Sequence, residues 1–362
     1  MKKKNRVIAF FSLFLVCFLI MTPIVLGATR GTYLLNYVSS QQNGNNGFGD
    51  SHESTARALE ILDYFNALER VNTSATQQYL RSEIVKMFDN NAINLYDLYY
   101  LLKSIDILNS TTTEVSTGLK EKIKLYLEDL NQTGGGFSPT NATESSSTMI
   151  STYFAIETYS ILLDDAFQVM EIHKTWIKNC RDPITGGYQG NITASIPSLI
   201  NTYCAVSIMQ RAGAIGELTD IIKTVSYCNS FLVSMEADQT NFGGYLPDLT
   251  ADNALISSTY YSIQVIYMLS SNAPLKENTI NWIYNRQNFL DGGFTDIIYE
   301  SVQGYSSIAS SYFALKSLVL LGASLDIEIW MVEFNYIILI VIFIILAIII
   351  GIAIFLWRRR KL

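Results

Sequence analysis

Histidine and cysteine are scarce in this chain, which limits the metal and redox chemistry that it can support. The 362 residues include two histidines, His52 and His173, and four cysteines. The histidines are far apart in sequence, so they form no metal-binding pair, and we expect each at a surface or helix-capping position. Cys180, Cys204 and Cys228 lie between the terminal segments at spacings that suit no disulfide framework. One disulfide bridge among these three cysteines remains an alternative, but buried free thiols fit their odd number better. We also predict no metal and no cofactor.

Charged residues are absent from an apolar run near the start of the chain. Val7–Leu26 follows a basic stretch and precedes the small residues Gly27 and Ala28. This order is typical of a signal peptide, which we predict over residues 1–28. The apolar run is also long enough to remain as an uncleaved anchor. In either form the residues that follow are expected to be exported.

A second uncharged run lies near the other end. Tyr336–Trp357 is rich in Ile and Leu and is followed by a basic cluster, Arg358–Lys361. It predicts a transmembrane helix over 336–357 with a basic cytoplasmic tail over 358–362. A cleaved sorting signal of the same layout is the alternative. The predicted protein is thus a single-pass protein of the cell membrane with its N-terminal domain outside, and its linker, 323–335, reaches at most about 45 Å.

Acidic residues outnumber basic ones once the two ends are set aside. The chain holds 25 Lys and Arg and 32 Asp and Glu. Four basic residues lie in the first six positions and four in the last five, so 17 basic residues face 32 acidic ones between them, a net charge of −15. Such a domain repels the phosphates of nucleic acids and of anionic lipid head groups, so we exclude both as partners. Cations and neutral or basic ligands remain open.

Five N-glycosylation sequons fall in the exported region, as in a glycoprotein if the organism modifies its exported proteins. A chain rich in Asn, Ser and Thr also yields such sequons by chance, so they do not establish the modification. They begin at Asn72, Asn109, Asn131, Asn141 and Asn191.

Glycine is concentrated in a turn motif that ends in an aromatic residue and recurs along the chain. The aromatic residues of successive motifs are separated by 89, 51, 57 and 49 positions. The first gap is nearly double the others, and residues 88–91 near its middle read as a degenerate turn without glycine. Counting that turn gives six repeats with a period of about 50 residues. The aromatic residues are Phe48, Phe137, Tyr188, Tyr245 and Phe294.

Apolar periodicity predicts one helix before each turn and a second helix after it. Glycine permits the reversal because it reaches positive φ, and the aromatic residue is expected to fill the gap between neighbouring hairpins. Ser and Thr at the start of each second helix are expected to cap its free amides. We predict first helices near 31–42, 75–90, 115–131, 166–180, 217–235 and 275–288, and second helices near 54–68, 95–109, 147–163, 198–213, 257–270 and 307–322.

One repeat carries a family resemblance. The segment Gln287–Phe294, with Gln287, Asp291 and a Gly-Gly-aromatic ending, resembles the repeat shared by protein prenyltransferase beta subunits and squalene-type terpenoid cyclases. The resemblance covers nearly all of residues 31–322. It implies an all-α fold, an alpha/alpha toroid of six helical hairpins in an inner and an outer ring. We therefore assign the toroid to residues 29–322, but a shared fold does not fix a function.

The catalytic motifs of the resembled families are not retained. The prenyltransferase zinc ligands, an aspartate, a cysteine and a histidine, correspond to Ser257, Thr259 and Ala309. The acidic motif of class II cyclases has only a partial counterpart at Asp164 and Asp165, and the thioester motif found in related toroids is missing. Whether the protein is an enzyme therefore stays open.

Acidic residues near the start of the predicted inner helices are the remaining candidates for ligand binding. Paired carboxylates there suit glycan hydrolysis or a hard cation, although solvated loop carboxylates need no such explanation. His52 suits acid-base chemistry, and Tyr260 belongs to a set of aromatic residues that line an isoprenoid funnel in the resembled enzymes. The candidates are Asp50, His52, Glu53, Asp252, Asp296 and Tyr260.

These observations predict a membrane-anchored toroid that acts as a ligand-binding or protein-interaction module outside the cytoplasm. Its ligand would be a lipid, a glycan or another protein at the cell surface. The alternative is a divergent enzyme that acts on an isoprenoid, another lipid or a glycan in the central cavity. A ring filled by side chains favours the module, whereas a deep aromatic cavity with two facing carboxylates favours the enzyme.

Overall fold

The computed structural model describes most of the chain between its two predicted membrane-targeting segments. The described residues are 28–109, 115–142, 145–163, 169–270, 272–288, 290–296, 298–299, 302–303 and 305–329. The predicted signal peptide up to residue 27, the predicted span 336–357 and the partial acidic motif at Asp164 lie outside them. Within the described ranges, no helix combines the length and the apolar character needed to cross a bilayer.

The chain divides into two compact units. One comprises the segments up to Arg30 and from Asp326 onward, and its described part is a short antiparallel ribbon. In this ribbon β1 (Ala28–Thr29) pairs with β4 (Glu328–Ile329). The other unit, Gly31–Leu325, is the helical domain.

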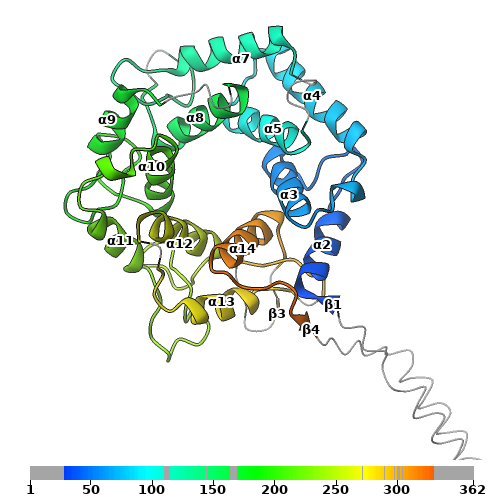
Figure 1. The fold of residues 1–362 in the computed structure, drawn as a ribbon, viewed down its shortest axis with the longest axis vertical. Helices are drawn as coiled ribbons and strands as arrows, with labels where there is room; N and C mark the ends of the chain where they lie inside the picture. Colours follow the sequence, from blue (N-terminus) through cyan, green and yellow to red (C-terminus); the bar gives the residue numbers. More distant parts are fainter. Residues whose placement is uncertain are drawn as a thin grey trace, which may run out of the picture. The chain divides into compact units, whose positions relative to one another are not determined.

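The helical domain consists of two concentric rings of helices (Figure 1). The described residues form twelve α-helices, six in each ring, which confirms the predicted toroid. The outer ring contains α2 (Arg30–Ser40), α4 (Thr73–Asp89), α7 (Thr117–Leu130), α9 (Glu171–Asn179), α11 (Ile221–Asn229) and α13 (Lys276–Tyr284). The inner ring contains α3 (His52–Tyr64), α5 (Leu95–Ile107), α8 (Met149–Leu163), α10 (Leu199–Arg211), α12 (Ile256–Ser270) and α14 (Ile308–Leu320).

The inner helices form a closed and parallel ring. Each packs against the next in chain order, and α14 packs against α3. Four tyrosines, each the fifth residue of its helix, mark the level at which these helices begin; they are Tyr153, Tyr203, Tyr260 and Tyr312. The centroids of successive tyrosine side-chain rings in this series are 5.8, 5.5 and 6.3 Å apart. These helices therefore run in the same direction and begin at a common level. We call the face where the inner helices begin the mouth.

The aromatic residue of each glycine turn is buried between the two rings, as predicted. All five of these aromatic side chains are at most 2% exposed. Glycine is required beside them for two reasons, as Gly243 illustrates. Its φ is +92°, and a Cβ there would lie 2.6 Å from the backbone of Asn278 in the next outer helix.

Ser and Thr residues of the inner helices accept hydrogen bonds from the backbone amides of these aromatic residues. Thr259 accepts a hydrogen bond from the Tyr245 amide at 3.0 Å and donates one to the Leu255 carbonyl at 2.8 Å. Equivalent bonds reach the amides of the other aromatic residues. The prediction that these hydroxyls cap their own helix was therefore wrong for this position, because the preceding turn uses the hydroxyl. The caps lie earlier, as where Ser198 accepts from the Asn201 amide at 3.3 Å.

The second repeat makes its turn without glycine. Asn91 takes a φ of +51° after the end of α4, and Asn94 accepts hydrogen bonds from the amides of Tyr96 and Asp97 at the start of α5. Asparagine tolerates the left-handed region better than other residues with a side chain. The predicted degenerate turn is thus a functional replacement for the glycine motif.

His173 differs from its predicted surface position. Its side chain in α9 is 1% exposed and stacks on Phe137, with the two ring centroids 4.8 Å apart. Its Nδ1 accepts a hydrogen bond from the Gly136 amide at 3.0 Å. Burial lowers its pKa below the ordinary value, so the neutral imidazole is favoured. The predicted free thiols are confirmed, because Cys180, Cys204 and Cys228 are all unpaired and buried.

Candidate functional site

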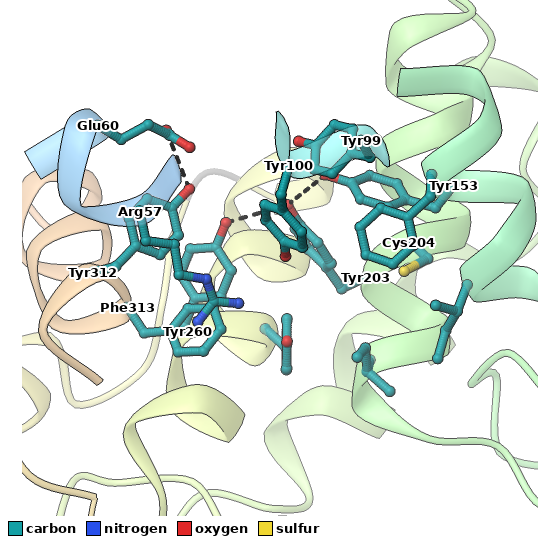
Figure 2. Close-up of a pocket in the computed structure, with 14 residues that line it drawn as sticks. Arg57, Glu60, Tyr99, Tyr100, Tyr153, Tyr203, Cys204, Tyr260, Tyr312 and Phe313 are labelled. Carbon is teal, nitrogen blue, oxygen red and sulfur yellow. Dashed lines mark hydrogen bonds between the residues drawn. The ribbon is translucent and has the colours of Figure 1, made fainter. Parts of the chain in front are cut away.

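A cluster of tyrosine side chains fills the centre of the ring (Figure 2). Because the inner helices begin at one level, the fifth residue of five of them meets there. The hydroxyls of Tyr153 and Tyr203 lie 3.5 Å apart, and those of Tyr203 and Tyr260 lie 3.2 Å apart. The five residues are Tyr99, Tyr153, Tyr203, Tyr260 and Tyr312.

The sixth residue of each inner helix completes the lining, and α3 supplies a cation at this position. The other five helices contribute Tyr100, Phe154, Cys204, Tyr261 and Phe313, whereas α3 contributes Arg57. The Arg57 guanidinium lies 4.1 Å from the Phe313 ring centroid and forms an ion pair with Glu53. Burial acts to lower the pKa of Arg57, but Tyr100 and Glu53 outweigh it and hold the pKa above its ordinary value.

A second carboxylate faces the cluster from α3. Glu60 accepts a hydrogen bond from the Tyr312 hydroxyl at 3.3 Å, and its other contact is the Lys316 ammonium at 3.4 Å. Glu53 is thus paired with Arg57 and accepts hydrogen bonds from the Tyr96 and Tyr100 hydroxyls. Glu60 is paired in the same way with Lys316 and the Tyr312 hydroxyl. Paired in this way, they serve as structural anchors of the aromatic cluster.

The space left in the centre is small. The cavity has a volume of about 70 Å³, whereas pockets for small organic ligands usually span roughly 300 to 1,000 Å³. It has room for a few water molecules. The predicted aromatic lining is therefore correct, but the side chains occupy the space that a funnel for an isoprenoid chain requires.

Burial also keeps the central groups protonated. It raises the pKa of Tyr153, Tyr260 and Tyr312 well above the ordinary tyrosine value, with smaller contributions from neighbouring tyrosines and glutamates. It likewise raises the pKa of the Cys204 thiol. Neutral hydroxyls and a neutral thiol neither abstract a proton nor attack a substrate readily at ordinary pH.

A polar groove lies at the mouth beside α3. It has a volume of about 510 Å³, and its lining includes Asp50, His52, Tyr79 and Asp97. His52 Nδ1 lies 3.1 Å from Asp97 Oδ1, and its Nε2 lies 3.9 Å from Glu83 Oε2. The groove therefore brings two predicted candidates, Asp50 and His52, together with Tyr79 of α4 and the carboxylate of Asp97 in α5.

An apolar pocket lies on the other side of the first turn of α5. Its volume is about 300 Å³, and it is lined by Ile93, Leu95, Tyr96, Pro139, Ile150 and Phe154, with three polar neighbours. Ile150 also borders the central cavity. The Tyr96 hydroxyl bonds Glu53, which places this third candidate between the pocket and the central cluster.

The two remaining acidic candidates lie elsewhere. Asp296 accepts hydrogen bonds from the Ile256 amide and the Ser310 hydroxyl, each at 2.9 Å, so it connects the starts of α12 and α14. Asp252 is exposed on the loop before α12, where its carbonyl accepts the Asn241 amide group at 2.9 Å. Among the residues that the structure describes, no hydrogen bond or ion pair joins either one to His52 or Glu53, so the six candidates do not form one site.

The residues at the family zinc positions do not fit a metal. Ser257 and Ala309 lack a side chain that binds zinc well, and the Thr259 hydroxyl is held by the Tyr245 amide. Elsewhere in the described ranges, no three His, Cys, Asp or Glu side chains converge as metal ligands would.

Sequence reasoning did not single out Arg57, Asp97 or Tyr79. Arg57 carries a detectable signal, because it is a charged residue on the inward face of a helix whose equivalents are mostly aromatic. Asp97 and Tyr79 belong to different helices from Asp50 and His52. Their place in the groove follows from how the first two hairpins pack, which periodicity alone does not give.

Comparison with known proteins agrees with this architecture. The family model for the prenyltransferase alpha-alpha toroid domain matches residues 72–245, 142–304 and 245–334. No curated protein sequence matches the chain significantly.

Several solved structures share the fold at low sequence identity. Protein geranylgeranyltransferase-I of Candida albicans, complexed with GGPP, has a TM-score of 0.60 and 16% identity, covering 78% of this chain and 85% of its own. A variant of the type II terpene cyclase MstE from Scytonema, bound to merosterolic acid A, has a TM-score of 0.55 and 12% identity, covering 80% and 95%. An alpha-1,6-mannanase variant of Salegentibacter sp. with alpha-1,6-mannotriose has a TM-score of 0.51 and 15% identity, covering 81% and 98%. These likenesses show the fold alone.

Proposed function

Because the chain belongs to the prenyltransferase alpha-alpha toroid family but fills the centre of its ring with tyrosines, we propose that it is a binding module for another protein. In this proposal the toroid is held outside the cytoplasm at a membrane and does not transfer prenyl groups. The observation that carries the proposal is the volume of the central cavity, about 70 Å³.

The chemistry of the centre supports a binding role. A prenyl transfer needs room for the isoprenoid chain and an activated nucleophile. Here Tyr203 and Tyr260 occupy the middle of the ring, and the Cys204 thiol has a raised pKa. The carboxylates of Glu53 and Glu60 are engaged by Arg57 and Lys316. An enzyme of this type would have to displace several buried, hydrogen-bonded side chains to admit a substrate.

The predicted anchor sets the orientation that we propose. The ring ends at Leu325, after the C-terminal end of α14 and thus at the face opposite the mouth. Ten residues, 326–335, precede the predicted span, and they reach at most about 35 Å when fully extended. We propose that partners bind at the mouth, because the chain leaves the helical domain at the opposite face.

Two experiments on the full chain test the proposal, a ligand titration in lipid nanodiscs and a cross-linking experiment in native membranes. A fluorescent geranylgeranyl diphosphate analogue is titrated first, and we expect no saturable binding. A photoreactive amino acid is then placed at Ile196, which is exposed two residues before the cap of α10, or at Leu125, which is exposed on the outer helix α7. In native membranes we expect a discrete protein adduct from position 196 and none from 125.

Two results would count against the binding module. Saturable binding or turnover of the isoprenoid analogue by the wild-type chain would restore the enzyme hypothesis. An adduct pattern that is equal at the two positions would show that the mouth is not the interacting face. Substitution Tyr260→Ala provides the matched control for the ligand assay, because it enlarges the central cavity without changing the mouth.

A further inference from the structure

We infer that the two pockets on either side of the first turn of α5 form one docking site for a partner protein segment that carries an apolar side chain next to a basic one. The apolar half is the pocket of about 300 Å³ beside Tyr96. The acidic half is the groove of about 510 Å³ beside Asp97. The inference rests on the proposed binding function and names the chemistry of the partner.

The apolar half is open to solvent. Ile150 is 36% exposed and Tyr96 is 37% exposed, although both lie in the first turns of inner helices whose other apolar residues are mainly buried. Pro139, from the loop that leads toward α8, contributes to the same lining. A concave apolar pocket of this volume accepts one large aliphatic or aromatic side chain, and removal of that surface from water favours binding.

The acidic half has carboxylates available for a cation. Asp50 is exposed and has no hydrogen-bond or ion-pair partner in the part of the chain that the structure describes. Asp97 lines the groove and uses Oδ1 toward His52, which leaves its Oδ2 without a hydrogen-bond partner among the described residues. The nearby Lys86 ammonium is engaged by Glu83 at 2.6 Å and is not part of the lining. The groove therefore has an excess of negative charge that suits Lys or Arg.

The two halves are close enough for one short segment. Tyr96 and Asp97 are consecutive residues of α5, and consecutive Cα atoms lie about 3.8 Å apart. In an extended peptide, consecutive Cα atoms are also about 3.8 Å apart, and their side chains point to opposite sides of the chain. A partner with adjacent apolar and basic residues can thus cross the helix end with one side chain in each half.

Charge and polarity favour a protein segment over other partners. Anionic lipids and nucleic acids carry phosphates that the acidic half repels. A saccharide would have to place hydroxyl groups in the apolar half, where Ile93, Ile150 and Phe154 offer no hydrogen bonds from their side chains. Of its polar neighbours, Asn94 and Ser151 already use their side-chain oxygens at the starts of α5 and α8. A peptide with one apolar and one basic side chain satisfies both halves.

Selection from a phage-displayed library of random peptides of about 12 residues tests the site, with the full chain in nanodiscs as the target. We expect enrichment of sequences that place Lys or Arg within about two positions of Leu, Ile or Phe. The best peptide is then synthesised, and its Kd is measured for four variants of the protein. Asp50→Asn with Asp97→Asn removes the charge, and Ile150→Ser alters the apolar half. Asp252→Asn and Leu249→Ser, both on the exposed loop before α12, are controls.

The two halves make separate predictions. The charge-removing pair is expected to weaken binding by at least about tenfold and to reduce its dependence on salt. Ile150→Ser is expected to weaken binding by at least about tenfold with the salt dependence retained. The two controls are expected to stay within about twofold. All four variants are first required to keep the wild-type melting temperature within about 2 °C.

Several outcomes would overturn the docking site. These are the absence of enriched peptides, enrichment of acidic peptides, and equal loss of affinity in the controls and the site variants. Retention of soluble alpha-1,6-mannotriose by the same face would instead make it a saccharide site. If a protein adduct still forms at position 196 while these tests fail, the binding module stands and only the assignment of its partner falls.

Discussion

The hydroxyl of Thr259 should contribute measurably to stability because it is the partner of a buried backbone amide. Tyr245 and Thr259 are both 0% exposed, and the Tyr245 amide donates to Thr259 Oγ1 at 3.0 Å. Thr259→Val keeps the shape of the side chain but leaves this amide without a partner. The Leu255 carbonyl keeps its helical partner, the Thr259 amide at 3.0 Å. The expected loss is therefore that of one buried unsatisfied donor, about 1 to 3 kcal/mol.

Two matched variants separate this effect from a general cost of substitution. Thr158 is equally buried in α8, but its hydroxyl bonds only the Phe154 carbonyl four residues earlier. Thr158→Val should change the free energy of unfolding by less than about 0.5 kcal/mol. Thr259→Ser should retain most of the stability, since Ser311 already holds the Phe294 amide at 2.9 Å in the last repeat.

Thermal and urea unfolding of the full chain, followed by tryptophan fluorescence, measures the differences. For a domain of this size the loss from Thr259→Val corresponds to a fall in Tm of about 2 to 6 °C. Equal stability of Thr259→Val and Thr158→Val would refute the reasoning, because it would show that the Tyr245 amide does not depend on the hydroxyl.

Two further predictions concern the turns. Gly243→Ala should cost at least about 2 kcal/mol, because its φ is +92° and the new Cβ would lie 2.6 Å from Asn278; Gly216→Ala, which meets nothing within 4 Å and has no positive φ, is the control in thermal unfolding. His173 has a pKa that burial lowers below 6.5, so the unfolded chain binds a proton first as pH falls. Stability should therefore decline from about pH 7 to about pH 5. His173→Gln should flatten this part of the profile, and an unchanged slope in urea midpoints measured against pH would disprove the assignment.

The sequence was informative about the fold because the same pattern of two helices and a turn occurs in every repeat. The apolar period, the glycine turns and the aromatic residue after them recur, so an error in one repeat is corrected by the others. Even the repeat that lacks glycine was recognisable, since Asn90 and Asn91 stand where the turn is needed. The predicted helices agree with α2 to α14 apart from their ends. The largest difference is at α11, which spans Ile221–Asn229 and is shorter than the predicted helix 217–235 at both ends.

The candidate site was less predictable, because it depends on distances between repeats. Sequence placed Asp50, His52 and Glu53 at the mouth, but the packing of the hairpins determines that Asp97 joins the first two and that the hydroxyls of Tyr96 and Tyr100 join the third. The volume of the central cavity is also a property of side-chain rotamers. Recurrent tyrosines on inner helices fit both an open funnel and a filled ring, and the hydroxyl contacts of Tyr203 distinguish them.

The closure of the ring has a mechanical consequence. The Gly31 amide donates to the Leu325 carbonyl at 2.9 Å, so the first and last residues of the helical domain are adjacent. A force that pulls the two chain ends apart would therefore act first on the first and last repeats. It would open the seam where α14 meets α3 before it stretched the repeats on the far side of the ring.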